Sequence, residues 1–447
     1  MAIKEALQQG TEARLFPSLS ERSKEGRATS ILLSCLKGVP EFSQVLFAYL
    51  GESVGKRTRL SAFTEVTFKD LRIEAHERPD GLIILTSGQT EWSALLEVKV
   101  GNNTLEAPQI ERYIDLARRQ KIDAVITVSN QFTPHPQEHP AKVSGNKIGK
   151  LNLYHRSWSF ILTQADLLLQ NDEIADTDRH FIIHELCRFL TDASAGIKGF
   201  EQMPTCWPTY VEDVRMGAKA SRSKPELAEI VAAWHQEERD LSFVLTKMVG
   251  TTVRPRLSRK FQRQFKLRIE EDIKTLSETN VLSSIIDIPN AASPISISAD
   301  IVSRSIAVAM RIDAPGDKVY GPARVRWLLQ QLKSTDLDNI GICAFWKGRR
   351  DVVPVPLSEA TDRHHSFLGD DGKAIPSTFE VRMVHQLGAK FGSRKGFIRA
   401  LESMVPDFHR AVGQRLKKWQ PPVPKVRDER PNAQSVSTES LSEEYER

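Results

Sequence analysis

The chain has 447 residues, of which 40% are hydrophobic and 27% are charged, and its formal net charge is +5. This composition is that of folded globular domains, which excludes a low-complexity or fibrous chain. The length is more than one hydrophobic core supports well, so we expect two or three domains. The mildly basic balance permits contact with a polyanion without requiring it.

The cysteine content favours a reducing compartment. The four cysteines are too few and too scattered for a disulfide framework, and no two have the CxxC spacing of a zinc or redox site. The sequence opens without a signal-like segment, and no uninterrupted apolar run reaches the length of about 18 residues that a membrane span needs. We therefore expect a cytoplasmic protein with no membrane contact.

The first part of the chain predicts a mixed α/β domain over roughly residues 20–195. Apolar residues at helical spacing, interrupted at Gly38-Val39-Pro40, predict two helices between residues 20 and 50. Strands, helices and further strands then alternate, which is typical of a sheet covered on both faces. The later elements are expected as strands at 61–73, 81–85, 92–100, 122–129 and 151–155, and as helices at 108–120, 164–170 and 178–191.

The second half predicts a helical connector, a smaller C-terminal domain and a tail. Residues 196–289 read as mostly helical, and residues 290–418 read as a small α/β unit to about 358 followed by a helical stretch at about 378–418. Residues 420–447 are rich in proline and charge, so we expect a disordered tail. The predicted fold class is therefore α/β, with two unlike domains.

Acidic residues and one lysine cluster on the predicted strands of the first domain. Side chains alternate along a strand, so Glu97 and Lys99 in WSALLEVKV share one face. Asp80 lies at the entrance of the neighbouring strand, and Glu65 lies inside the strand before it. If these strands are adjacent, three carboxylates and one ammonium converge.

Such a group suits hydrolysis of a phosphodiester bond. Mg²⁺ held by carboxylates supplies a Lewis acid, and a lysine beside the ion can orient the attacking water and offset charge in the transition state. The alternative is that these residues are ordinary charges at strand ends and sheet edges, where a lysine discourages aggregation.

The same residues carry a family resemblance. Pro79-Asp80, then sixteen residues, then Glu97-Val98-Lys99 resembles the PD-(D/E)xK motif of the restriction-endonuclease-like nuclease superfamily, and Gln109 to Tyr113 resembles the QxxxY element of its RecB-type members. The resemblance covers residues 20–195 and implies a mixed sheet flanked by helices.

The resemblance also implies a role for each matching residue. Asp80, Glu97, the backbone carbonyl of Val98 and Glu65 would bind Mg²⁺, for which Mn²⁺ could substitute. Lys99 would assist the attacking water. Gln109 and Tyr113 would position the substrate. The upstream acid is the least certain of these, because Glu21 and Glu25 on the first helix compete with Glu65.

The function implied is metal-dependent cleavage of DNA, in prokaryotic restriction, phage defence or repair. Two alternatives stay open: a catalytically idle nuclease fold that binds nucleic acid or a protein partner through its C-terminal half, and a nuclease that acts on RNA. Double-strand cutting by a domain with one site would favour a homodimer with two-fold symmetry.

A second candidate is a basic segment, RPRLSRKFQRQFKLRIEED. On one continuous helix its basic residues would fall in an arc of about 120° opposite an apolar stripe, and they would either contact phosphates or form a solvated face. The basic residues are Arg256, Arg259, Lys260, Arg263 and Lys266.

Two further patterns are rejected as sites. GESVGKRT, at 51–58, has too few residues between its glycines for a phosphate-binding P-loop and lacks the Ser or Thr that binds Mg²⁺. His135 and His139 have the spacing of helical metal ligands, but the prolines around them forbid a helix, so we expect a solvated loop.

Overall fold

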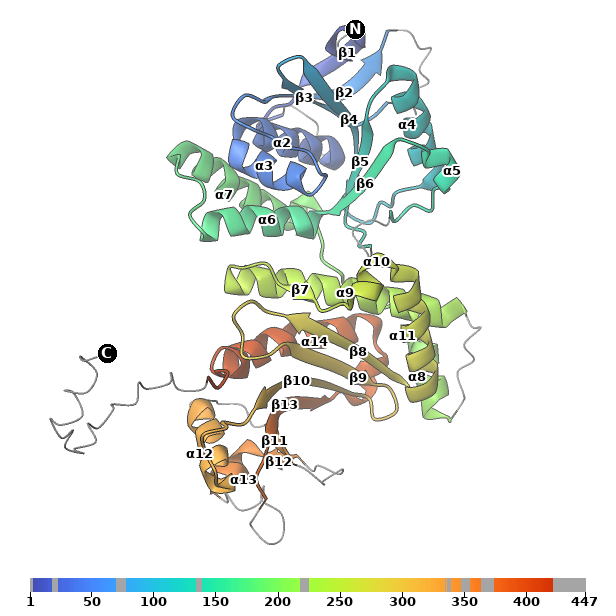
Figure 1. The fold of residues 1–447 in the computed structure, drawn as a ribbon. Helices are drawn as coiled ribbons and strands as arrows, with labels where there is room; N and C mark the ends of the chain where they lie inside the picture. Colours follow the sequence, from blue (N-terminus) through green and yellow to red (C-terminus); the bar gives the residue numbers. More distant parts are fainter. Residues whose placement is uncertain are drawn as a thin grey trace, which may run out of the picture.

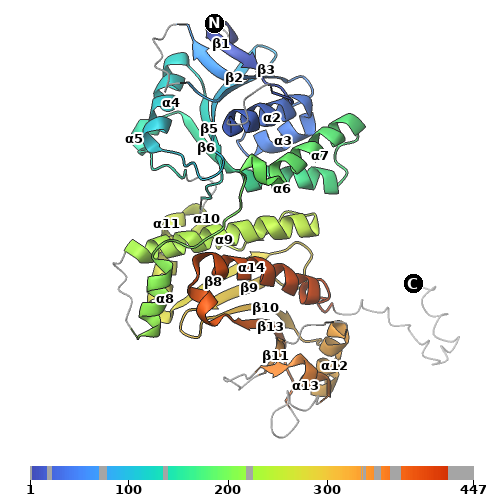
Figure 2. The same cartoon turned by 180° about the vertical axis from the view of Figure 1, so that it is seen from behind.

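The protein is mixed α/β and contains two sheets, one in each half of the chain. The computed structural model describes residues 3–17, 23–69, 78–133, 139–217, 225–333, 335, 339–346, 354–362 and 374–420. Figures 1 and 2 show the two halves one above the other, with the long helix α9 (Pro225–Val249) between them.

The first sheet has six strands in sequence order, β1 to β6. Neighbouring strands are antiparallel from β1 to β4, whereas β5 lies parallel to both β4 and β6. The strands are β1 (Leu7–Glu12), β2 (Arg59–Phe68), β3 (Gly81–Ser87), β4 (Thr90–Val98), β5 (Ala124–Ser129) and β6 (Asn152–Ser157). All five strands that the sequence predicted are present in this sheet.

Helices cover both faces of the first sheet, as predicted. Apolar residues of four helices pack on one face and those of α4 pack on the other. The first group is α2 (Lys24–Gly38), α3 (Pro40–Ala48), α6 (Trp158–Gln170) and α7 (Thr177–Thr191), and the second is α4 (Ala107–Gln120) with the short α5 (Gly145–Ile148). Figure 1 shows the two groups on opposite sides of the strands.

Helix α4 makes the crossover between two parallel strands. Pro108 lies in its first turn, where a missing N–H costs nothing, and Ile110, Ile114 and Ala117 form the apolar stripe that packs on the sheet. Lys121 ends the helix in the left-handed region, with φ of 58°. Gln109 therefore lies one turn into the helix, beside the end of β4.

The first domain begins earlier than residue 20. Residues Ile3–Ala6 form α1, and Leu7–Glu12 form β1, an edge strand that pairs with β2. The sequence LQQGTE has no alternating apolar residues, and almost all of β1 is exposed, so pairing rests on the backbone alone. This explains why the pattern of side chains did not predict it.

The second half of the chain has a seven-stranded sheet in which every pairing is antiparallel. Its strand order is β12-β11-β13-β10-β9-β8-β7. The strands are β7 (Arg254–Pro255), β8 (Val281–Asp287), β9 (Ile295–Asp300), β10 (Ser305–Asp313), β11 (Ile340–Phe345), β12 (Val355–Pro356) and β13 (Thr378–Gln386).

Helices of this half share one hydrophobic core with the sheet. Trp234 on α9 and Phe397 on α14 are central to it, and Trp234 also donates its indole N–H to the carbonyl of Ser283 on β8 at 3.1 Å. The helices are α8 (Trp207–Arg215), α9, α10 (Arg259–Arg263), α11 (Phe265–Thr279), α12 (Gly321–Leu332), α13 (Leu357–Asp362) and α14 (Arg394–Phe408).

Two predictions for this half are wrong. The connector at 196–289 and the domain at 290–418 form a single unit, because β7 and β8 belong to the second sheet and α8 and α9 pack in its core. The helical stretch at 378–418 begins instead with strand β13, whose alternating Phe379, Val381 and Met383 are buried while it pairs with β10 and β11. The tail at 421–447 lies outside the described residues.

The two units meet along α9. Arg239 donates to the carbonyl and the hydroxyl of Thr133 at 3.0 and 3.2 Å, and Phe243 packs against Phe132 and Phe160. Arg239 of the second unit is therefore hydrogen-bonded to the segment that follows β5 in the first unit.

Two smaller findings concern composition. All four cysteines are free thiols, as predicted. Among the residues that the structure describes, no single helix has both the length and the apolar character needed to cross a membrane.

Candidate active site

The β3–β4 hairpin brings Asp80 beside the end of β4. Gly81 pairs with Leu96 in the antiparallel register, so Asp80 at the entrance of β3 lies next to Glu97. The Asp80 carboxylate accepts a hydrogen bond of 2.8 Å from the amide of Val98. This bond fixes the direction of the Asp80 carboxylate toward the end of β4.

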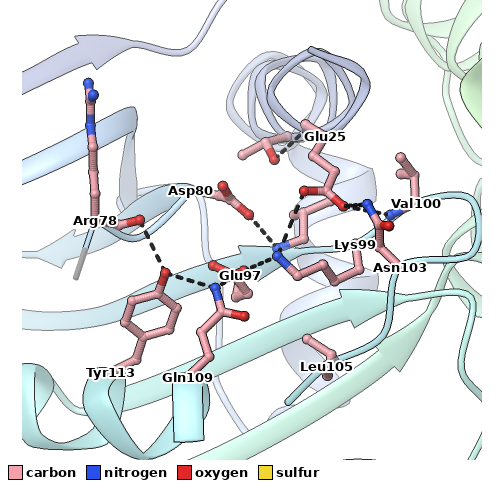
Figure 3. A network of polar contacts seen from close by, with 12 residues as sticks. Glu25, Arg78, Asp80, Glu97, Lys99, Val100, Asn103, Leu105, Gln109 and Tyr113 are labelled. Atoms are coloured by element: carbon pink, nitrogen blue, oxygen red, sulfur yellow. Dashed lines mark hydrogen bonds and ion pairs between the residues drawn. The ribbon is translucent and has the colours of Figure 1, made fainter. Parts of the chain in front are cut away.

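Glu97 and Lys99 share a face of β4, as strand alternation predicts. The ammonium of Lys99 lies 2.5 Å from Oε1 of Glu97, whose side chain is only 1% exposed. Figure 3 shows Lys99 reaching between Glu97 and a second carboxylate, that of Glu25 on α2. The Lys99 ammonium is 3.7 Å from Oε2 of Glu25.

Glu25 takes the place that the sequence left open for an upstream acid. It lies in the first turn of α2, where a carboxylate is favoured by the helix dipole. Its Oε1 accepts from the side-chain amide of Asn103 at 2.8 Å and from the backbone amide of Val100 at 3.4 Å. Glu25 thus joins α2 to the segment that follows β4. The other candidate, Glu21, lies outside the described residues.

The carboxylate of Glu65, expected to complete the metal site, pairs with Arg78 instead of Lys99. Its φ of 55° marks a bulge in β2, where the register with β1 shifts between the pairs Gln9–Thr67 and Thr11–Thr64. The bulge puts Phe63 and Val66 into the same core, which strict alternation would forbid. The Glu65 amide still bonds the carbonyl of Asp80 at 3.2 Å, but its carboxylate pairs with Arg78 at 3.0 Å and is 57% exposed.

Gln109 and Tyr113 hold Glu97 rather than facing the solvent. The amide of Gln109 donates to Oε1 of Glu97 at 2.6 Å and to the Tyr113 hydroxyl at 3.2 Å. The Tyr113 hydroxyl in turn donates to the carbonyl of Arg78 at 3.1 Å. The predicted pair on one face of α4 is confirmed, and its contacts orient the Glu97 carboxylate. A role in positioning a substrate stays a prediction.

The main chain of Lys99 is held on both sides. Its amide donates to the carbonyl of Val128 on β5 at 2.8 Å, and its carbonyl accepts from the indole of Trp158 at 3.0 Å. Trp158 opens α6 and is fully buried. Nothing in the sequence around Trp158 linked it to the site, because the contact depends on the tertiary packing of α6.

The segment after Lys99 is tied to the linker between the two units. The side-chain amide of Asn130 donates to the carbonyls of Gly101 and Gly196 at 3.0 and 2.8 Å, and its oxygen accepts from the amide of Lys198 at 3.0 Å. Gly101 and Gly196 also bond each other directly at 2.7 Å, and both have positive φ. These bonds, which we call the Asn130 clamp, join the site to residues that lead into the second unit.

The carboxylates and the lysine shift one another's protonation. Burial raises the pKa of Asp80 well above its usual range, and the nearby Glu97 carboxylate raises it further. For Lys99, burial lowers the pKa, but Glu97 and Glu25 outweigh burial, so the pKa is raised overall. Lys99 is therefore a protonated cation at neutral pH.

The donor set suits a hard divalent cation. Asp80, Glu97 and Glu25 offer carboxylate oxygens, the ligands that Mg²⁺ prefers, and Oε2 of Glu97 is buried with no hydrogen-bond partner among the described residues. As the side chains stand, no group of three or more His, Cys, Asp or Glu in the described part of the chain is arranged to hold a metal ion, and Lys99 lies between two of these acids. The carboxylate oxygens are therefore suitable ligands for Mg²⁺, and a bound ion would share them with Lys99. Metal binding by the backbone carbonyl of Val98 stays a prediction.

A cavity of about 860 Å³ opens over this network. Asp80 and Glu25 line it, together with the ends of β1 and α2 and the Gly101 segment. The site is therefore reached from outside, as a substrate would require.

The basic segment is broken and lies apart from this network. Gln264, with φ of −131°, separates α10 from α11, so the five basic residues do not share one helix. Arg256 forms an ion pair of 2.7 Å with Asp287, while Lys266 lines a second cavity of about 1380 Å³ between the two units. Of the expected apolar stripe, only Phe265 is buried.

His139 was expected in a solvated loop, but its side chain is packed against the first sheet. Its Nε2 lies 2.8 Å from the Thr127 hydroxyl, its ring packs edge-on against His155, and burial lowers its pKa to about 4. His139 is thus a neutral packing residue, and His135 lies outside the described residues.

Comparison with known proteins gives no relative: no family model, curated protein or solved structure matches the chain.

Proposed function

We propose that the chain is a metal-dependent nuclease of the PD-(D/E)xK superfamily, in its RecB-type QxxxY variant, and that it cleaves DNA. The observation that carries this proposal is the convergence of Asp80, Glu97 and Lys99 from two strands, with Gln109 of the following helix bonded to Glu97. A structural role alone gives no reason to gather three buried or half-buried acids around one lysine at the floor of a cavity.

Asp80, Glu97 and Glu25 would hold Mg²⁺ or Mn²⁺. A bound divalent ion supplies a Lewis acid that stabilises charge on the phosphate and favours the hydroxide form of water. Gln109 and Tyr113 contribute by fixing the rotamer of Glu97, since the three side chains form one hydrogen-bonded chain that ends on the carbonyl of Arg78.

Lys99 acts in this proposal as a fixed positive charge. Its raised pKa keeps the ammonium protonated at neutral pH, so it can donate hydrogen bonds to water or to a phosphate oxygen but cannot accept a proton. The double anchoring of its main chain by Val128 and Trp158 holds that charge in place.

Arg259, Lys260, Arg263 and Lys266 remain our proposed contacts to nucleic acid in the second unit. All four are exposed, and none forms an ion pair with a carboxylate among the described residues. Arg256 is the weakest member of the predicted set, because Asp287 already pairs with it.

The direct test is cleavage of supercoiled plasmid, linear duplex, single-stranded DNA and RNA with Mg²⁺ or Mn²⁺. We expect wild-type protein to cut DNA, and Asp80→Asn and Lys99→Ala to lose activity, while the exposed Asp313→Asn serves as a charge-matched control. Loss of cutting only in the first two variants supports the site. Equal cutting by all variants would place the chemistry elsewhere.

One observation favours the alternative of an idle nuclease fold that binds nucleic acid or protein. Lys99 already forms ion pairs with both Glu97 and Glu25, and no ready metal-holding group exists among the described residues. Calorimetric titration with Mg²⁺ separates the two: binding that Asp80→Asn abolishes supports the nuclease, whereas no binding to wild-type protein supports the idle fold.

The biological setting we propose is prokaryotic restriction, phage defence or repair, which rests on the family resemblance alone. A dependence of double-strand breaks on protein concentration squared would support a homodimer, since each chain offers one such site.

A further inference from the structure

Two cations at the mouth of the cavity have no use in the arrangement described so far. Among the described residues, three basic side chains line the cavity, those of Arg14, Lys24 and Arg78. Arg78 pairs with Glu65. Neither Arg14 nor Lys24 forms an ion pair within the described ranges, and both are exposed.

Arg14 is held in place by its main chain. The buried hydroxyl of Ser30 on α2 accepts from the Arg14 amide at 2.9 Å and donates to the Arg14 carbonyl at 2.8 Å. The preceding Ala13 is buried and bonds the carbonyl of Ala62 on β2 at 3.1 Å. The guanidinium thus projects from a fixed point beside α2, so binding costs only the entropy of one side chain.

Lys24 stands where a helix disfavours a cation. It is in the first turn of α2, at the positive end of the helix dipole, and the N-cap Ser23 makes no side-chain hydrogen bond to the helix. Ser23, Lys24 and Gly26 all line the cavity. Local rules that are broken in this way are typical of functional positions.

Because the cavity is also lined by acids, binding of a polyanion there would depend on these two cations. Glu12 is neutralised by Lys37, and Glu65 by Arg78. Glu25, whose carboxylate lies 3.7 Å from the Lys99 ammonium, and the half-buried Asp80 also line the cavity wall, and neither offers positive charge to the phosphates that flank a scissile bond. Within the described residues, the basic side chains of the cavity that form no ion pair are those of Arg14 and Lys24.

We propose that Arg14 and Lys24 form a phosphate subsite that binds the nucleic-acid backbone beside the phosphate to be cut. The ligand is a phosphodiester group of the substrate strand, held by the guanidinium and the ammonium. This subsite rests on the proposed nuclease function, and it assigns substrate binding to a pair of residues that lie outside the PD-(D/E)xK motif.

The test measures binding and cutting separately, with Arg14→Ala/Lys24→Ala as the principal variant. Lys333→Ala/Lys395→Ala removes the same charge from exposed positions of the second unit and is the control. Binding of a fluorescent oligonucleotide is followed in EDTA over a range of salt, so it needs neither metal nor catalysis. Thermal unfolding checks that the Ser30 bonds, which use only the main chain of Arg14, survive.

We expect the principal variant to bind the oligonucleotide about tenfold more weakly. The slope of the logarithm of the binding constant against the logarithm of the salt concentration should become less steep by about one for each residue removed. In the cleavage assay KM should rise while kcat is kept, and Arg14→Lys should restore part of the affinity. Affinity and salt slope equal to those of wild type or the control would overturn the subsite. If wild-type protein binds in EDTA through these residues but cuts nothing, the subsite stands and the nuclease function fails.

Discussion

The indole N–H of Trp158 donates a hydrogen bond of 3.0 Å to the main-chain carbonyl of Lys99. One partner lies at the start of α6 and the other just past the end of β4, so the bond joins a helix of the covering layer to the strand that carries the proposed chemistry. Its loss should therefore affect both stability and activity.

Trp158→Phe should lower the free energy of unfolding by about 1–3 kcal/mol, because it leaves a buried carbonyl without a partner. Trp207→Phe is a matched control, since Trp207 is also fully buried and donates to the carbonyl of Phe391 at 2.9 Å in the second unit. Urea unfolding should show a loss in both variants, whereas kcat for DNA cleavage should fall only in Trp158→Phe. A fall in kcat of equal size in both would deny the bond any role in the site.

Glu25 and Glu65 can be compared directly through Glu25→Gln and Glu65→Gln. Glu25 contacts Lys99 and Asn103 beside the other acids, so its change should lower activity and Mg²⁺ affinity by about 10- to 100-fold. Glu65 forms an exposed pair with Arg78, which is worth about 0–1 kcal/mol, and its change should leave both measurements unaltered. The reverse ranking would return Glu65 to the metal site.

Asp240 on α9 predicts a dependence of stability on pH. Burial raises its pKa to about 6, although the amide of Phe200 donates to its carboxylate at 2.7 Å and opposes the shift. The folded state holds the proton of the Asp240 carboxyl more tightly than the unfolded chain does. The contribution of this proton to the free energy of unfolding is therefore complete below about pH 4. It is then lost as pH rises to about 6.

Asp240→Asn removes the titration, so the variant should match wild type near pH 4 and exceed its stability above pH 6 by at most about 3 kcal/mol. Urea unfolding at a series of pH values measures the gap, with the exposed Asp313→Asn as the control. A gap that does not change with pH would contradict the assignment.

The Asn130 clamp predicts an effect on activity from a residue outside the network of acids. Asn130→Ala removes three hydrogen bonds to Gly101, Gly196 and Lys198, so unfolding should become easier by about 2–4 kcal/mol. Cleavage should also slow, because the segment that bonds Glu25 follows Lys99 directly. Asn152→Ala, at an exposed position of β6, is the control. A variant that is less stable but fully active would limit the clamp to a structural role.

The hairpin and the helix that follows could be predicted because their signals are local. Alternation in β4 placed Glu97 and Lys99 on one face, and the four-residue spacing of Gln109 and Tyr113 placed them on one side of α4. The structure confirms these pairings. The residue that each pair contacts is set by tertiary packing, so the bond between Gln109 and Glu97 could not be predicted from spacing along the chain.

The parts that were missed lack a local signal. The left-handed backbone of Glu65 is uncommon for a residue other than glycine, so its position inside a predicted strand did not reveal where its carboxylate points. Strand β1 pairs through its backbone, and β13 was merged into the helix that follows it although its apolar residues alternate. Trp158 and Asn130 reach the site from elements distant in sequence, and residue patterns carry no information on such contacts.

The direct bond between Gly101 and Gly196 ties the connection between the two units to the end of β4, where the proposed catalytic residues lie. A force applied to the second unit, such as the tension of a bound nucleic-acid strand, would reach the segment after Lys99 through this bond and the Asn130 side chain, in addition to the contacts along α9. The linker would then transmit force between the half that we propose binds nucleic acid and the main chain that follows Lys99.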